Sequence, residues 1–283
     1  MAAVDSAPFE VRRQSCAVAG EALGEGPPVV LLHGITATRR YVVHGSKVLA
    51  RGGYRQVIYD ARGHGRSDPA PPGGGYTYPE LVADAEVVVG EQVGDRTFVI
   101  GGHSMGAHTA VAYALEETDR IAGLVVIGPV YMGFTDPAAL ESWDRLAAGL
   151  ERDGIDGFMR AIDHDLDPAW RDVVLRFTRE RMGEHRHLDA LARALREVPR
   201  SVPFDAMSDL ELLDVPALVV ASHDTADPGH PYAVSAAYAE AMPNAQLISE
   251  EEGGSPLAWQ GGRLARAIAR FADSDPVRSR LKG

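Results

Sequence analysis

The residues best suited to chemistry are the five at 102–106, with the sequence Gly-His-Ser-Met-Gly. A short, mostly apolar run at 97–100 precedes them and helix-forming residues follow, which predicts a strand, a sharp turn and a helix. The two glycines lack the Cβ atoms that would clash in such a turn, so Ser104 can hold a strained backbone with its hydroxyl exposed. The N–H of Met105 would then lie at a helix N-terminus, where unpaired donors favour an oxyanion. The pattern predicts a nucleophilic serine, although a serine that only caps a helix fits the same spacing.

Composition and charge limit the classes of protein and partner. The chain has 283 residues, enough for one large α/β domain with an insertion, and 45% of them are hydrophobic. Its formal net charge of −12 disfavours nucleic acid or an anionic membrane as a partner, and no apolar run approaches the roughly 18 residues of a membrane span. Cys16, the single cysteine, excludes an internal disulfide, and the first residues lack the features of a signal peptide, so we expect a cytoplasmic protein. Without a cysteine cluster or a spaced His/Asp set, we expect no metal and no cofactor.

Strand and helix patterns alternate in the two outer parts of the chain. A hairpin is expected over 9–22, and short apolar runs predict strands at 29–32, 57–60, 97–100, 124–127, 217–220 and 245–248. Helices are expected over 39–50, around 82–89, directly after Ser104, and around 264–271, with a frayed tail after Ala272. This alternation predicts a parallel sheet with right-handed crossovers.

The strand rhythm stops between 129 and 209. Apolar residues there recur at helical spacing in four groups, and Asp167-Pro168 is a typical start for the third helix. We therefore expect a core formed by 1–128 and 210–283, with residues 129–209 inserted as an all-helical cap, or lid, over the carboxyl ends of the strands.

Five features follow one another in an order typical of one family. They are His33-Gly34, Asp60-x-Arg62-Gly63-x-Gly65-x-Ser67, Gly102-x-Ser104-x-Gly106, the helical insertion, and a strand followed by Asp224. From about 9 to 272 the chain resembles the α/β-hydrolase fold family, most closely the esterase, lactonase and peroxidase-like branch with a helical cap. The resemblance implies an α/β fold with a mostly parallel eight-stranded sheet flanked by helices and an inserted all-helical cap.

The resemblance also implies roles for individual residues. Ser104 matches the nucleophile, and the N–H groups of Ile35 and Met105 match the donors of an oxyanion hole. Asp224, just past the strand that follows the cap, matches the acid that orients a catalytic histidine. We favour it over Asp227, which we expect to cap or turn the loop.

Other polar residues near these motifs are expected to be structural. We expect His33 to brace its loop by hydrogen bonds, and His103 either to flank the nucleophile or to pack on a neighbouring strand. The loop 62–68 is structural in this family.

The chain departs from the family at the catalytic histidine. Aligned on Ser255-Pro256, that position holds Gly254, and no histidine follows His230. A serine without a base is a poor nucleophile. The base could have moved to His230 on the loop after Asp224, although a residue that merely starts the next helix fits that place as well.

Two further explanations remain open. The chain could have kept the pocket and lost the chemistry, or its chemistry could need no strong base or borrow one from the substrate or the cap. The cap offers His164, His185 and His187, of which the last two are interpreted as surface residues.

These observations define two candidate functions. The first is hydrolysis of a small, partly apolar ester, thioester or lactone through Ser104, with a relocated or non-standard base, for which the partner is a small-molecule substrate. Relatives that open epoxides place aspartate at the nucleophile position, which disfavours that reaction here. The alternative is a catalytically degenerate hydrolase that acts as a small-molecule binding protein or receptor.

Overall fold

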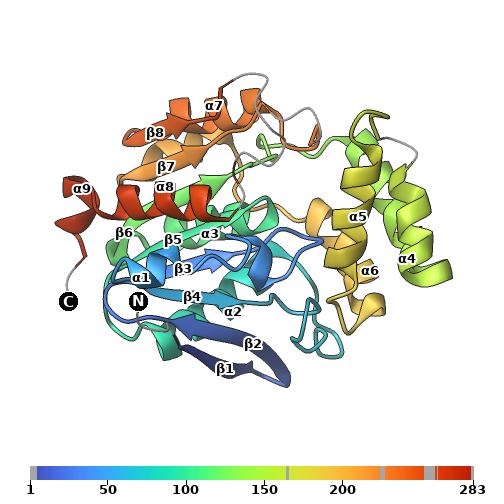
Figure 1. Cartoon of the computed structure of the whole chain (residues 1–283), viewed down its shortest axis with the longest axis horizontal. Helices are drawn as coiled ribbons and strands as arrows, with labels where there is room; N and C mark the ends of the chain where they lie inside the picture. Colours follow the sequence, from blue (N-terminus) through green and yellow to red (C-terminus); the bar gives the residue numbers. More distant parts are fainter. Residues whose placement is uncertain (1–4, 164–165, 224–226, 252–258, 260, 282–283) are drawn as a thin grey trace.

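The computed structural model describes residues 5–163, 166–223, 227–251, 259 and 261–281 (Figure 1). Eight strands form one sheet in the order β1-β2-β4-β3-β5-β6-β7-β8. The first three in the chain are β1 (Ser6–Arg13), β2 (Cys16–Leu23) and β3 (Pro28–Leu32); the others are β4 (Arg55–Tyr59), β5 (Phe98–His103), β6 (Ile121–Ile127), β7 (Ala217–Val220) and β8 (Ala245–Ile248). The hairpin β1–β2 joins the edge antiparallel, and β3 to β8 are parallel. The predicted mostly parallel eight-stranded α/β fold is confirmed.

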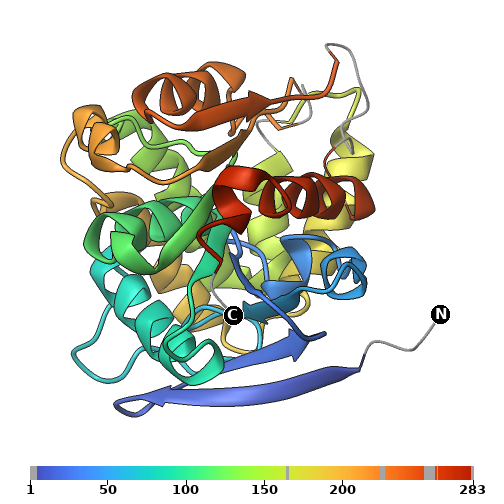
Figure 2. The ribbon, with the colours of Figure 1, turned by 90° about the vertical axis from the view of Figure 1, so that its left-hand side faces the viewer.

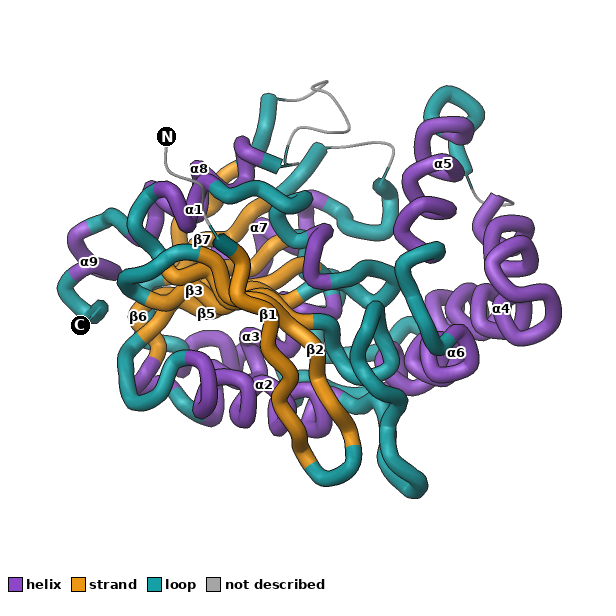
Figure 3. Tube along the Cα trace, turned by 60° about the horizontal axis from the view of Figure 1, so that its bottom comes forward, coloured by secondary structure: helices purple, strands orange, loops and turns teal. Residues whose placement is uncertain are grey.

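Helices cover both faces of this sheet (Figures 2 and 3). One face packs against α2 (Tyr78–Gln92), α3 (Met105–Glu116) and α7 (Tyr232–Ala241), and the other against α1 (Val48–Arg51), α8 (Gly262–Ala272) and α9 (Asp275–Arg278). Because both faces are covered, the central strands β3, β5 and β6 are buried almost throughout, which explains why they read as continuous apolar runs. Among the described helices, none is both long and apolar enough to cross a membrane.

The insertion between β6 and β7 is helical. Its helices are α4 (Pro137–Asp163), α5 (Arg171–Met182) and α6 (Leu188–Glu197), followed by 3₁₀ turns at Val198–Arg200 and Met207–Leu212. Figure 1 shows α4, α5 and α6 grouped to one side of the sheet. Thr38 and Tyr41, in the loop after β3, donate hydrogen bonds to Glu184, and the N–H of Gly65, in the loop after β4, donates to His185. The insertion therefore packs against loops at the carboxyl ends of the parallel strands.

Three local predictions were wrong. Residues 39–50 form a 3₁₀ turn (Arg39–Tyr41) and only the start of α1, because His44 and Gly45 have positive φ and interrupt the helix. The helix expected to start at Pro168, α5, begins at Arg171, because Asp167 accepts the N–H of Ala169 at its carboxylate and that of Trp170 at its carbonyl and so forms a separate turn. Through residue 281, the last one described, the tail is ordered, since Val277 of α9 is fully buried against the sheet.

Candidate active site

Ser104 lies at a sharp turn between β5 and α3 and has φ 53° and ψ −116°. Such a left-handed backbone costs a non-glycine residue about 1–3 kcal/mol, so the surroundings must enforce it. The N–H of Ser104 donates to the carbonyl of Ile127 at the end of β6, at 3.0 Å. A Cβ on Gly106 would lie 2.3 Å from the carbonyl oxygen of Leu32. The strained backbone predicted from the flanking glycines is therefore present, and close packing of α3 on β3 holds it.

The loop after β3 passes beside this turn. A Cβ on Gly34 would lie 3.4 Å from the Cβ of Ser104, and the side chains of Ile35 and Met105 belong to one buried cluster. Neither the N–H of Ile35 nor that of Met105 donates a hydrogen bond to any other residue in the described part of the chain. Two unused backbone donors thus lie on the segments that border Ser104.

His33 braces this loop, as predicted. Its Nε2 accepts a hydrogen bond from the N–H of Ala61 at 2.9 Å, and its Nδ1–H donates to the carbonyl of Gly34 at 2.8 Å. Burial and the neighbouring His64 lower the pKa of His33 to about 3, so the ring stays neutral. The carbonyl of Gly34 and the N–H of Ile35 belong to one peptide plane and point in opposite directions. The hydrogen bond from His33 therefore also fixes the direction of the Ile35 N–H.

His185 does not lie on the surface, which corrects that prediction. The residue is 8% exposed, and its Nδ1 accepts the N–H of Gly65 at 3.0 Å. Burial lowers its pKa to about 3, so it acts as a neutral acceptor that joins the cap to the loop after β4. His187 is partly exposed.

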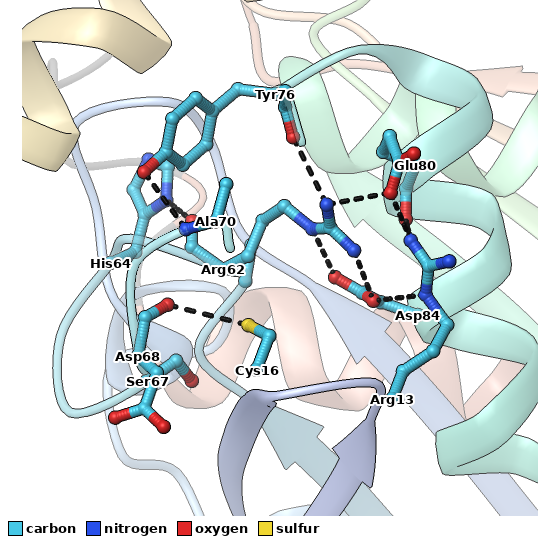
Figure 4. Close-up of polar contacts among 12 residues, drawn as sticks. Arg13, Cys16, Arg62, His64, Ser67, Asp68, Ala70, Tyr76, Glu80 and Asp84 are labelled. Atoms are coloured by element: carbon cyan, nitrogen blue, oxygen red, sulfur yellow. Dashed lines mark hydrogen bonds and ion pairs between the residues drawn. The ribbon is translucent and has the colours of Figure 1, made fainter. Parts of the chain in front are cut away.

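The loop 62–68 is held by a buried arginine (Figure 4). Nε and Nη2 of Arg62 donate to the two carboxylate oxygens of Asp84 at 2.6 and 2.7 Å, and Nη1 donates to the carbonyl of Gly75. Glu80 lies 2.6 Å from the same guanidinium, and Arg13 reaches Asp84 from β1. This network ties the loop to α2 and to the edge hairpin, in agreement with its structural role.

The only carboxylate–imidazole pair near Ser104 among the described residues joins Asp227 and His230. Nδ1 of His230 lies 2.8 Å from Oδ2 of Asp227, which leaves Nε2 as the acceptor nitrogen of a neutral ring. The His230 ring lies 4.7 Å from that of His103, the residue before Ser104. Gly128, at the end of β6, makes room for both rings, since a Cβ there would lie 3.3–3.4 Å from each.

The acid of this pair differs from the one favoured by the sequence. Asp224 lies outside the described residues, as do Gly254 and His164, so their predicted roles stay predictions. Asp227 turns the loop, as expected, by accepting the N–H of His230 at its carbonyl, but its carboxylate also binds the His230 ring. Sequence reasoning missed that contact, although the Asp-x-x-His spacing places the two side chains on one side of a turn.

The electrostatics keep Asp227 ionised and His103 neutral. Burial opposes the charge of Asp227, but the nearby His230 outweighs it and lowers the pKa of the carboxyl to about 2. Burial and His230 lower the pKa of His103 to about 3. The guanidinium of Arg181, in α5, also lowers the pKa of Asp227. Burial lowers the pKa of Arg181 itself, and the Nε of Arg181 has no hydrogen-bond partner in the described structure.

A second carboxylate missed from the sequence is Glu250, just after β8. It is buried and accepts hydrogen bonds from the hydroxyl of Ser222 at 2.6 Å, the N–H of His223 at 2.7 Å and the indole of Trp259 at 2.9 Å. Burial opposes ionisation, but these donors lower the pKa of Glu250 below its usual range. Glu250 therefore anchors the loop that leads from β7 toward Asp227.

Comparisons with known proteins agree with this geometry. A family model described as alpha/beta hydrolase fold matches residues 27–205. A putative non-heme chloroperoxidase of Synechocystis is 30% identical over 256 residues, which cover 84% of this chain and 88% of that protein. Epoxide hydrolase B of Mycobacterium tuberculosis is 38% identical over 109 residues, but the match spans only 38% of this chain and 30% of that protein. A thermophilic esterase from Thermogutta terrifontis, solved with malate bound, has the same fold, with a TM-score of 0.75 at 22% identity over 98% of this chain and 100% of that one. This chain therefore belongs to the α/β-hydrolase fold family.

Proposed function

We propose that this protein hydrolyses a small, partly apolar carboxylic ester, thioester or lactone through nucleophilic Ser104. The observation that carries the proposal is the positive φ of Ser104 at the junction of β5 and α3. A fold that maintains a strained serine beside two unused N–H donors is consistent with acyl transfer, in which both features are needed. The substrate class rests on analogy with the family.

In the proposed reaction, Oγ of Ser104 attacks the carbonyl carbon while its proton passes to Nε2 of His230. The N–H groups of Ile35 and Met105 stabilise the negative oxygen of the tetrahedral intermediate, each contributing about 3 kcal/mol. The intermediate collapses, and the leaving alkoxide or thiolate takes the proton from His230. Water then attacks the acyl-serine with the same base, which releases the acid and restores Ser104.

Asp227 is proposed as the residue that orients the base, in place of Asp224. Its contact with Nδ1 supports this assignment, because an Nδ1–H held by a carboxylate leaves Nε2 free to accept a proton. The half-exposed carboxylate, with 50% of its side-chain surface accessible, also balances the imidazolium that forms during attack.

We also propose that residues 129–209 act as a lid on a core formed by 1–128 and 210–283. The loop between α5 and α6 contacts the loops that carry His33 and Arg62, through Glu184 and His185, and this supports a position of the segment over the route to Ser104. Substrate selection would then depend on the lid, and the enzyme would work in the cytoplasm on a soluble small molecule.

A fluorophosphonate probe and a nitrophenyl ester test the proposal. We expect the probe to label Ser104 and the ester to be cleaved, with both signals lost in Ser104→Ala. We expect His230→Ala to lower kcat by about 10³-fold or more, while His187→Ala, in the cap, keeps full activity. Activity that survives in His230→Ala would remove His230 from the mechanism.

The second candidate, a small-molecule binding protein, is favoured by one observation. Gly254 occupies the family's histidine position and His230 is the last histidine in the chain. A binding protein would neither react with the probe nor cleave the ester, yet a ligand would raise its melting temperature. Gly254→His separates the cases, because it should create activity only where the base is absent and the rest of the site is intact.

A further inference from the structure

We propose that His103, Asp227 and His230 bind a divalent zinc-type cation beside Ser104, and that this cation inhibits the enzyme. One ligand atom from each of the three side chains lies within 4.8 Å of the other two. Asp227 and His230 lie three residues apart on the loop between β7 and α7, whereas His103 is the last residue of β5, more than 120 positions earlier in the chain. They converge only in the folded protein.

The donor set suits a transition metal. Two imidazoles and one carboxylate form the ligand set of catalytic zinc sites and of the facial triad of iron enzymes, both of which keep positions open for water or substrate. Zn–N and Zn–O distances of about 2.0–2.2 Å require ligand atoms about 3.3 Å apart in a tetrahedral site. Nδ1 of His230 and Oδ2 of Asp227 lie 2.8 Å apart, so a metal would separate these two atoms by about 0.5 Å, and the half-exposed Asp227 side chain has room to make this adjustment.

Of the three ligands, His103 is the one whose ring nitrogens have no hydrogen-bond partner among the described residues. By contrast, His33, His64, His108 and His185 each use both nitrogens. Its Nε2 faces Gly128, beside the His230 ring. An imidazole held next to a second imidazole, with neither nitrogen used, is available to coordinate a metal.

Inhibition follows from the chemistry of the imidazole, and this half of the inference rests on the proposed function. A cation bound through Nδ1 of His230 moves the ring proton to Nε2, and a cation bound through Nε2 occupies the lone pair directly. In either case His230 cannot accept the proton of Ser104, so esterase activity is lost until the metal is removed.

Zinc titration of the full-length, substrate-free chain tests the binding half. Competition with a chromophoric zinc indicator should show one equivalent bound, with a Kd below about 100 µM. Asp227→Asn and His103→Gln should each weaken binding at least about tenfold, the lower end of what loss of even an outer-shell partner costs. Arg181→Gln should tighten zinc binding, because the positive guanidinium interacts electrostatically with Asp227 and would repel a cation bound there. His187→Gln, a partly exposed histidine in the cap, is the matched control and should bind zinc as the unaltered chain does.

Two results would overturn the assignment: no stoichiometric binding, or equal affinity in the unaltered chain and in Asp227→Asn. Because Asp227 lies on an exposed loop, Asp227→Asn should fold normally. Its zinc affinity therefore tests the site even if His103→Gln perturbs the turn at Ser104. Where esterase activity is present, zinc should abolish it and a chelator should restore it. The titration uses no substrate, so it tests zinc binding independently of esterase activity. Failure to bind zinc would overturn the metal site but not the proposed esterase, and absence of esterase activity would overturn the proposed function but not the metal site.

Discussion

At the scale of single residues, the candidate site is built by backbone packing around one serine. Ser104 has a positive φ because α3 lies so close to β3 that only glycine fits at 106, and because its N–H is held by β6. The polar side chains around it divide into two groups. His33 and Glu250 hold loops in place, whereas Asp227 and His230 form a carboxylate–imidazole pair and the His103 ring lies beside that pair.

The choice between the two acids can be measured. We expect Asp227→Asn to lower kcat/KM for a nitrophenyl ester by about 10³–10⁴-fold, because an amide in place of the carboxylate favours the wrong tautomer of His230. Asp224→Asn is the matched control and should change kcat/KM by less than about tenfold. The reverse pattern would restore Asp224 as the acid.

The sequence located the strained serine but not the residues that pack around it, for a physical reason. Ser104 depends on its immediate neighbours, and the two glycines that permit its backbone are local in sequence. The contacts of Asp227 and the burial of His185 depend on how loops pack, which no local pattern encodes. His185 looked exposed because it lies two residues from His187, yet packing on Gly65 buries it.

At the scale of elements, the junction of α3 and β3 is the part most sensitive to volume. A Cβ on Gly106 would meet backbone atoms of Leu32, which cannot move aside as a side chain could, whereas a Cβ on Gly90 in α2 meets nothing within 4 Å. We expect Gly106→Ala to lower the free energy of unfolding by about 1–3 kcal/mol or more, as overpacking does. Gly90→Ala should raise it by about 0.5–1 kcal/mol, because alanine favours the helix. Urea denaturation of both variants checks the contrast; equal effects would mean that the close approach is not enforced.

The loop after β4 depends on its buried ion pair. Arg62→Met should leave the buried carboxylate of Asp84 with only Arg13 as a charged partner, and we expect a loss of about 3–5 kcal/mol. Arg66→Met, an exposed arginine of the same loop, should change stability by less than about 0.5 kcal/mol. Thermal unfolding of the two variants measures the difference, and similar melting temperatures would contradict the structural role of Arg62.

Element type was easier to predict than element bounds. Strands buried on both faces keep an apolar run whatever lies beside them, so the runs near 29–32, 124–127 and 217–220 located β3, β6 and β7 correctly. Helix ends depend on single backbone conformations. Gly154, with φ 60°, divides α4 into two helical parts at a kink, in line with the separate apolar groups before and after it, and Gly45, with φ 70°, prevents a helix that the apolar pattern favoured.

At the scale of the whole molecule, three buried histidines are neutral and hold separate elements together. His33, His108 and His185 are all buried, and burial lowers the pKa of each to about 3. His108 joins α3 to the loop after β6, since its Nε2 accepts the N–H groups of Val130 and Tyr131 while its Nδ1 meets the hydroxyl of Tyr78. The base of the insertion is thus attached to the core through a ring that must stay unprotonated.

Acid should therefore destabilise the protein in a defined window. The folded-state pKa of these histidines lies below the unfolded value of about 6.5, so between pH 6.5 and pH 3 the unfolded chain binds more protons, and stability falls as the pH falls. At pH 5 each contributes a loss of about 2 kcal/mol, and His103, whose pKa is also about 3, contributes a similar loss, so the four together remove about 8 kcal/mol, which is comparable with the net stability of a typical domain. Urea denaturation between pH 7 and pH 5 should show this slope, before carboxylates such as Glu250 add their own loss at lower pH. His108→Gln should be less stable at pH 7, because glutamine cannot satisfy all three contacts, but its slope should be shallower by about a quarter. A stability that does not change between pH 7 and pH 5 would mean that these rings are already protonated, or reach water, in the native state.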